Sequence, residues 1–261
     1  MSAARFFVPR GKLSVCSQVA LPQEIAHQVS AVLRLQPSQE IRLLDGSGSV
    51  FTCVLDSVTK QGVTGTIVAQ EKVVTEPRTQ LTLFQGMLKA AKFEWIIQKG
   101  TEIGISRFVP ITCERSVSGL DDVSEAKLNR WRTIATEAAE QSDRGIIPTI
   151  ANPISFSVAL EGLSEDICNL IAWENAADTV AGSLTIATAL GYTGAIGTTI
   201  TPNSNHVALF IGPEGGFTAA EITQAQRHHA HVVTLGPRIL RAETAALVAA
   251  TLVLSARGDL E

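Results

Sequence analysis

Two apolar segments near the end of the chain, each followed by a glycine–proline loop and a helical pattern, constrain the fold more than any other feature. The first, VALFI at 207–211, runs into GPEGGFT, and the second, HVVTL at 231–235, runs into GPRILRAET. Short buried strands that alternate with helices are typical of a parallel sheet covered by helices. Because ligands bind outside the carboxyl ends of such strands, we expect the two loops to form one pocket.

The segment from residue 81 onward shows the same alternation. LTLFQG at 81–86 and RFVPIT at 107–112 predict strands, and the segments 87–104 and 124–142 predict helices. Four apolar residues at helical spacing support the second helix: Leu128, Trp131, Ala135 and Ala138. The stretch 175–205 is rich in Ala, Gly and Thr with almost no charge, and it predicts a short helix and a flexible loop.

Residues 1–72 have a different character. Short apolar or β-branched runs are separated by Gly, Asp and Ser, and Asp45 to Gly48 fits a hairpin turn. One amphipathic stretch, EIAHQVSAVLRL at 24–35, predicts a helix among these strands. The sequence therefore predicts a small β-rich domain over 1–72 and an α/β domain over 73–261.

Charge is distributed unevenly between these two parts. The whole chain has a net charge of −4, but residues 1–72 carry seven Lys and Arg against five Asp and Glu, while the remainder carries fourteen against twenty. The first part is therefore net positive, which is compatible with a basic face for nucleic acid. The alternative is a solvated surface with no partner. The cations that such a face would use are Arg5, Arg10, Lys12, Arg34 and Arg42.

Composition also bears on compartment, membranes and metals. The longest apolar runs are far shorter than the roughly 20 residues of a membrane span, and no signal-peptide pattern is present, so we expect a cytoplasmic protein with no membrane partner. The cysteines lack Cys-x-x-Cys spacing and are expected to be small buried residues: Cys16, Cys53, Cys113 and Cys168. We expect no metal, because the histidines near the last predicted strand lack a convincing ligand pattern. Trp95 and Trp131 favour packing over RNA stacking.

The first glycine-rich loop matches neither common phosphate-binding pattern. It is not Gly-x-Gly-x-x-Gly or a nucleotide-hydrolase loop, and the carboxylate of Glu214 would repel phosphate. Its glycines do allow the backbone to approach a ligand closely, and Thr218 with Glu221 predicts a capping box that begins the next helix. A tight turn with no ligand is the alternative. The second loop adds Arg238 and Arg241, which suit a ligand with charged ends.

Four segments carry a resemblance to a known family. FEWIIQKGTEIGISRFVPITCERSV, RWRTIATEAAEQSDRGIIPTI, LFIGPEGGFTAAEI and LGPRILRAETAAL resemble the RsmE family of ribosomal RNA methyltransferases in order and approximate spacing. The resemblance implies a SPOUT-type α/β domain with a C-terminal trefoil knot, preceded by a small PUA-like β-barrel that binds RNA. It also implies S-adenosylmethionine as the cofactor and a homodimer as the assembly.

The resemblance places the cofactor in the two glycine–proline loops and at the strand end near Trp173. The implied cofactor-binding residues are Glu174, Ile211, Gly212, Pro213, Glu214, Gly215, Gly216, Leu235, Gly236, Ile239, Leu240, Arg241 and Thr244. Ala242 departs from the usual ILRTETA motif of the family, which removes a hydroxyl group. The candidate RNA-binding residues are Arg5, Arg10, Arg34, Lys92 and Arg144, each of which has a purely structural or solvated alternative.

The family reaction methylates N3 of a particular uridine in 16S rRNA of the small ribosomal subunit. That nitrogen carries a proton, so the site must help to remove the proton and must stabilise negative charge on the uracil carbonyls. Arg241 is the first candidate for the charge stabiliser, and Glu243 or Glu214 could orient it or accept the proton. The alternatives are structural roles: the arginine would form an ion pair with a glutamate, and the acid would stabilise the N-terminus of a helix. An RNA-binding ribosome assembly factor without turnover, or a SPOUT enzyme for another RNA site, would carry similar motifs.

Overall fold

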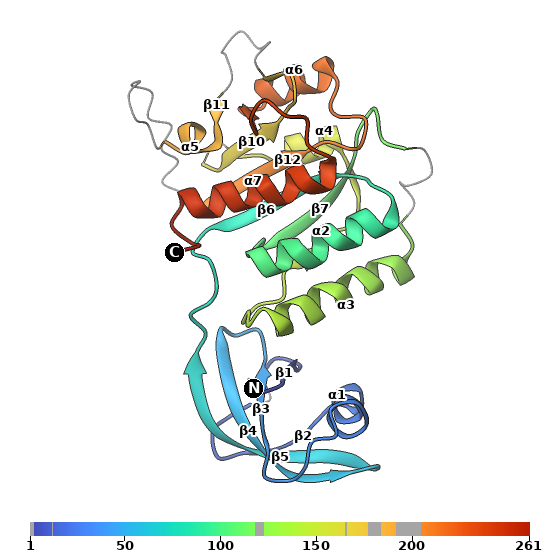
Figure 1. Cartoon of the computed structure of the whole chain (residues 1–261), viewed down its shortest axis with the longest axis vertical. Helices are drawn as coiled ribbons and strands as arrows, with labels where there is room; N and C mark the ends of the chain where they lie inside the picture. Colours follow the sequence, from blue (N-terminus) through green and yellow to red (C-terminus); the bar gives the residue numbers. More distant parts are fainter. Residues whose placement is uncertain (1–2, 12, 118–122, 165, 177–183, 192–204) are drawn as a thin grey trace. The chain divides into compact units, whose positions relative to one another are not determined.

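The computed structural model describes residues 3–11, 13–117, 123–164, 166–176, 184–191 and 205–261 (Figure 1). The chain divides into two compact units. The first comprises Met1–Glu76 with Thr136–Ile147, and the second comprises Pro77–Ala135 with Pro148–Glu261. The shorter stretch of the first unit begins with the end of a helix that starts in the second unit and continues into the residues that follow that helix.

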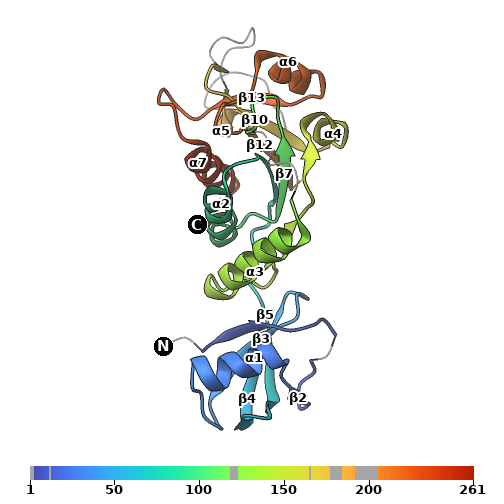
Figure 2. The ribbon, with the colours of Figure 1, turned by 90° about the vertical axis from the view of Figure 1, so that its right-hand side faces the viewer.

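The first unit contains a five-stranded mixed sheet in the order β1-β3-β4-β5-β2. Its strands are β1 (Arg5–Phe7), β2 (Gln18–Ala20), β3 (Glu40–Leu44), β4 (Ser49–Thr59) and β5 (Gly62–Lys72). Gly46 and Gly48 adopt positive φ in the turn between β3 and β4, which confirms the predicted hairpin. Helix α1 (Gln23–His27) and the π-helical turn η1 (Gln28–Val32) cover the core of this sheet (Figure 2). The predicted helix is thus shorter than expected, and Arg34 already has a φ of 54°.

The second unit is built on an eight-stranded parallel sheet, as the alternating pattern predicted. Its order is β11-β13-β10-β12-β6-β7-β8, with β9 paired to β7. The strands are β6 (Gln80–Gly86), β7 (Arg107–Thr112), β8 (Thr149–Ile150), β9 (Ile154–Ser155), β10 (Cys168–Ala172), β11 (Leu184–Thr185), β12 (His206–Ile211) and β13 (His231–Thr234). Strand β12 lies between β10 and β6, although both precede it in the chain.

Helices cover both faces of this sheet. They are α2 (Ala90–Ile103), α3 (Glu125–Gln141), α4 (Phe156–Glu161), α5 (Ile186–Ala189), α6 (Ala219–Arg227) and α7 (Ala242–Ala256). Figure 2 shows α2 and α7 side by side on one face and α4 on the other. On the α4 face, the rings of Phe84 and Phe210 stack with centroids 4.3 Å apart. No helix in the described ranges is both long and apolar enough to cross a membrane.

Several predictions about single residues can be compared with this core. Trp131 is fully buried against Phe93, with ring centroids 4.5 Å apart, whereas Trp95 is 43% exposed. Three of the four cysteines are buried as predicted, but the prediction is wrong for Cys16, which is exposed. The short helix expected within 175–205 is α5. The flexible loop predicted there falls on 177–183 and 192–204, outside the described residues.

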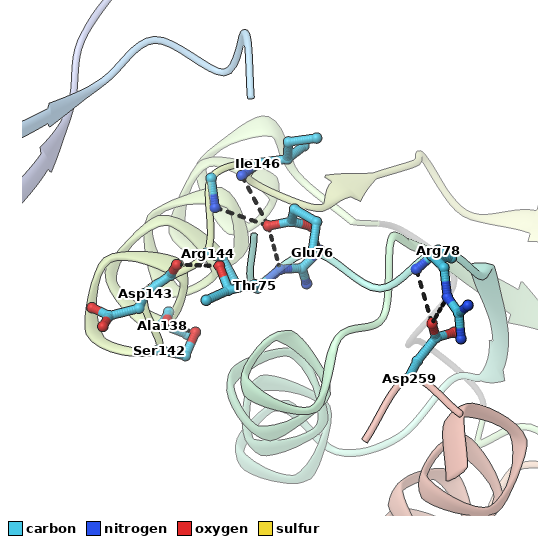
Figure 3. A network of polar contacts seen from close by, with 10 residues as sticks. Thr75, Glu76, Arg78, Ala138, Ser142, Asp143, Arg144, Ile146 and Asp259 are labelled. Carbon is cyan, nitrogen blue, oxygen red and sulfur yellow. Dashed lines mark hydrogen bonds and ion pairs between the residues drawn. The ribbon is translucent and has the colours of Figure 1, made fainter. Parts of the chain in front are cut away.

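A buried ion pair attaches the stretch after α3 to the first unit (Figure 3). The carboxylate of Glu76 accepts hydrogen bonds from the Arg144 side chain at 2.8 Å and from the backbone N–H of Gly145 at 2.8 Å. Arg144 is only 3% exposed. A buried ion pair is tolerated when further hydrogen bonds satisfy it, and here backbone donors supply them. Arg144 therefore has a structural role in the first unit.

A second polar contact fixes the end of the chain within the second unit. The carboxylate of Asp259 accepts a hydrogen bond from the backbone N–H of Arg78 at 3.0 Å (Figure 3) and another from the backbone N–H of Thr79 at 3.1 Å. The Arg78 side chain also pairs with this carboxylate at 3.2 Å. Burial alone would raise the pKa of Asp259, but the hydrogen bonds from Thr79 and Arg78 outweigh it and the pKa lies below its ordinary value.

Replacing this carboxylate should destabilise the second unit. We expect Asp259→Asn to lower the free energy of unfolding by about 1–3 kcal/mol at neutral pH, because an amide replaces a charged acceptor of several hydrogen bonds. The pKa of Asp259 is lower in the folded state than in the unfolded state. Its contribution to stability is therefore present above the unfolded pKa of about 4 and is lost as the pH falls through the folded pKa. Urea unfolding at several pH values measures both effects. Glu261→Gln, a change of an exposed acid two residues away, is the control.

Candidate functional site

The carboxyl ends of β10, β12 and β13, three adjacent strands, surround one cavity of about 450 Å³. Its wall combines apolar side chains, glycine backbone and charged groups, which is typical of a site for a small organic ligand. The lining residues come from α2, from the ends of the three strands and from the start of α7: Lys92, Ala172, Trp173, Glu174, Ile211, Gly212, Pro213, Glu214, Gly215, Gly216, Phe217, Thr234, Leu235, Gly236, Arg238, Ile239, Leu240, Arg241, Ala242, Glu243 and Ala245.

Neighbouring elements fix the backbone of the first glycine-rich loop. A Cβ atom on Gly86, at the end of β6, would lie 2.7 Å from the carbonyl carbon of Gly212, so this approach requires glycine. The buried side chain of Gln85 donates a hydrogen bond to the Gly212 carbonyl at 3.2 Å. The loop is therefore supported from beneath by the adjacent strand.

Two further contacts hold the other end of this loop. Arg115 donates a hydrogen bond from its guanidinium to the carbonyl of Gly215 at 3.1 Å. Gly216 has a φ of 69°, a left-handed conformation that favours glycine. The predicted capping box is confirmed, because Thr218 and Glu221 each bind the other's backbone N–H at the start of α6. These contacts preorganise the loop around the cavity.

The electrostatics of the cavity centre on Lys92. Its Nζ atom lies 2.5 Å from Glu214 Oε1 and 3.6 Å from Glu243 Oε2, so one lysine pairs with two carboxylates from different loops. The hydrogen bond with Glu214 is the main reason that the pKa of Lys92 is raised. Among the described residues, Arg238 and Arg241 have no ion-pair partner. Their guanidinium groups are therefore candidates to pair with a ligand.

Two of the residues that line the cavity each have one polar atom that is buried without a hydrogen bond within the described part of the chain: Glu243 Oε2 and Trp173 Nε1. Buried polar atoms in native proteins are nearly always hydrogen-bonded, so each such atom calls for an explanation. This acceptor and this donor are therefore available to a ligand or to a bound water.

The structure brings together nearly all of the residues that the sequence suggested for a cofactor. Of that set, Thr244 alone does not line the cavity, and it is exposed on α7. Lys92, suggested for RNA, lines the cavity instead. Arg5 pairs with Asp143 at 2.6 Å, whereas Arg10 and Arg34 are exposed. Lys12 lies outside the described residues.

Sequence reasoning missed the supports beneath the loop. Gln85 and Gly86 could have been noticed as a polar residue and a glycine that end the apolar strand LTLFQG. Arg115 gave no comparable signal, because its partner Gly215 is 100 residues away in the chain. Within the described ranges, no group of three or more His, Cys, Asp and Glu could hold a metal ion.

Comparison with known proteins gives consistent relatives. The RNA methyltransferase domain family matches residues 75–254. Ribosomal RNA small subunit methyltransferase E of Bacillus subtilis is 32% identical over 249 residues, which are 94% of this chain and 93% of that protein. The protein of the same name from Synechocystis is 34% identical over 234 residues, which are 88% of this chain and 71% of that protein.

Solved structures show the same likeness over the whole chain. The crystal structure of ribosomal RNA small subunit methyltransferase E from Neisseria gonorrhoeae, bound to S-adenosylmethionine, has a TM-score of 0.83 and 31% identity, covering 97% of this chain and 98% of that one. A putative methyltransferase from Legionella pneumophila, also in complex with this cofactor, has a TM-score of 0.81 and 28% identity, covering 98% of both chains.

Proposed function

The chain belongs to the RNA methyltransferase family, and from that premise we propose that it transfers a methyl group from S-adenosylmethionine to N3 of a uridine in 16S rRNA. The observation that carries this proposal is the cavity at the ends of β10, β12 and β13. Two relatives of similar fold were crystallised with this cofactor. The small ribosomal subunit or its RNA is the proposed partner, and the proposed compartment is the cytoplasm, where that subunit is assembled.

The lining residues fit such a cofactor. Apolar side chains such as Ile211 and Leu240 suit the adenine ring, and the backbone at Gly212, Gly215 and Gly216 can approach the adenosine and methionine parts closely. The unpaired Nε1 of Trp173 supplies a buried donor. The bound cofactor would supply an electrophilic methyl group on a sulfonium. The chain itself must hold the uracil and stabilise charge on it.

Arg241 is the residue that we propose for charge stabilisation. It lines the cavity, and within the described part of the chain no carboxylate pairs with it. As N3 loses its proton, negative charge spreads to the two uracil carbonyls, and a guanidinium offers planar paired donors to such oxygens. An Arg already engaged in an ion pair could not act in this way without breaking that pair.

The finer architecture is part of the same proposal. A SPOUT-type trefoil knot is supported by the position of β12 between two earlier strands, and a PUA-like barrel by the mixed five-stranded sheet. We propose domains over 1–72 and 73–261. A homodimer through α7 is supported by Leu252, which is 44% exposed on this apolar helix, and by Ile239, which is 87% exposed in the cavity loop.

Replacing Arg241 should slow methyl transfer more than it weakens cofactor binding. We expect Arg241→Ala to lower the single-turnover rate by about 10²-fold or more, as for loss of one preorganised charge stabiliser. Calorimetry with S-adenosylmethionine and a radiolabelled transfer assay on small subunits measure the two effects. Arg238→Ala is the comparison variant, because its guanidinium lies in the same loop, lines the cavity and also lacks a carboxylate partner among the described residues; a larger loss in Arg238→Ala than in Arg241→Ala would assign the role to Arg238. An Arg241→Ala rate equal to wild type would reject this assignment.

The basic face of the first unit should contribute to RNA affinity. We expect Arg10→Glu to weaken RNA binding and to reduce its salt dependence, because a phosphate contact releases counterions. Cofactor affinity should stay near the wild-type value. Lys60→Glu is the control and reverses one positive charge in the same way. Lys60 lies in the β4–β5 turn, at one end of the 11-residue strand β4. Arg10 lies near the other end of β4, because the neighbouring Gly11 contacts Asp45 in the β3–β4 turn. Equal losses in both variants would indicate a general charge effect and no local contact.

Dimerisation can be tested with two exposed apolar residues. If α7 forms the interface, Leu252→Arg should convert a dimer to a monomer at micromolar concentration, because a charge would be buried without a partner. Val158→Arg on α4, where Val158 is 51% exposed, should leave the dimer intact. Light scattering reports the mass of each variant, and a wild-type monomer would contradict the proposal.

A further inference from the structure

The proposed reaction needs a group that takes the proton from uracil N3, and three carboxylates line the cavity. They are Glu174, Glu214 and Glu243. A proton acceptor must have a lone pair free to receive the proton, and it is most effective where water does not compete for that lone pair. The structure distinguishes the three carboxylates by these two criteria.

Glu214 and Glu174 each fail one criterion. The Oε1 atom of Glu214 already accepts a hydrogen bond from Lys92 Nζ at 2.5 Å, and the Glu214 side chain is 28% exposed, against 14% for Glu243. Glu174 is exposed at the end of β10, where water solvates its carboxylate. Neither carboxylate is both free of hydrogen bonds and shielded from water.

Glu243 meets both criteria. Its side chain is only 14% exposed, and its Oε2 atom is buried without a hydrogen bond among the described residues. Lys92 Nζ lies 3.6 Å from this oxygen, against 2.5 Å from Glu214 Oε1, so the charges attract while the oxygen is much less engaged than that of Glu214. Because Lys92 is anchored on Glu214, it holds the Glu243 carboxylate in place from a longer distance.

We infer that Glu243 Oε2 is the proton acceptor of the methyl-transfer reaction and that Lys92 is its positioning residue. This inference rests on the proposed function. In the step, the N3–H bond breaks, the proton forms a bond to Glu243 Oε2, and the electron pair stays on N3. That pair forms the bond to the methyl carbon as the carbon–sulfur bond breaks with its electrons on sulfur, leaving S-adenosylhomocysteine. Glu243 then releases the proton to water.

A structural role for Glu243 is the competing explanation, because acids in the first turn of a helix are favoured by the helix dipole. The two roles predict different pH behaviour. A proton acceptor is needed only while N3 is protonated, so its loss should matter less as the pH rises toward the pKa of N3. A helix-terminal acid would affect the rate by a factor that does not change in this way. The other charged groups that line the same cavity are Lys92, Glu174, Glu214, Arg238 and Arg241.

The test is the pH dependence of single-turnover methyl transfer to small subunits that lack the modification, with saturating S-adenosylmethionine. At neutral pH we expect Glu243→Gln to lower the rate by about 10²-fold or more, with cofactor affinity near the wild-type value. The deficit should shrink as the pH is raised. Glu214→Gln is the matched control: its amide oxygen can still accept the hydrogen bond from Lys92, so Lys92 stays in place and the variant should show a smaller deficit that is constant with pH. Lys92→Met should resemble a milder Glu243→Gln, because the carboxylate remains but is no longer held.

Three results would overturn the inference: a Glu243→Gln deficit that is constant with pH, a wild-type rate for that variant, or a pH-dependent deficit in Glu214→Gln instead. If Glu243→Gln fails to fold, Glu243→Asp retains a carboxylate that is pulled back by one methylene, and it should show a milder deficit that also shrinks as the pH rises. A Glu243→Asp deficit that is constant with pH would also contradict a carboxylate acceptor. Wild-type protein that transfers no methyl to N3 contradicts the proposed function itself, whereas failure of the variants alone contradicts only this inference.

Discussion

The candidate site depends on the parallel pairing of β12 with β6 on one side and β10 on the other. Since all of these strands run in the same direction, their carboxyl ends meet at one edge, and the loops that follow must share one space. Side chains packed across the sheet, such as the stacked Phe84 and Phe210, fix the register of this pairing. A strand shifted by one residue would point these rings to the opposite face and would separate the loops from their supports.

Rigid support of the loops explains how glycine-rich backbone can form a defined site. Glycine lowers the steric cost of close approach but leaves the chain free to adopt other conformations. Here Gln85 and Arg115 hold the loop carbonyls, and the capping box of Thr218 fixes where α6 begins. The glycine-rich loop is therefore held at several points by side chains. Charged side chains line the same cavity. Lys92 pairs with Glu214 and Glu243, and Arg238 and Arg241 are available to a ligand.

Much of this arrangement could be predicted from the sequence, because its signals are local. Apolar runs bounded by Gly-Pro loops predicted the parallel strands, and the Thr218–Glu221 spacing predicted a helix start. Contacts between distant segments could not be predicted in this way. Arg144 was suggested for RNA because it shares a predicted helical face with Glu137 and Gln141, but Glu76, 68 residues away, holds it in a buried ion pair. The strand order, with β12 inserted between earlier strands, also has no local signal.

The proposed function requires this cavity to bind a methyl donor with its methyl group next to N3 of a uridine. The most direct measurement is mass spectrometry of nucleosides from unmodified small subunits that were incubated with the wild-type protein and isotopically labelled S-adenosylmethionine. Labelled 3-methyluridine should appear at one position of 16S rRNA. Label on a ribose oxygen or on another base, or no transfer despite bound cofactor, would contradict it.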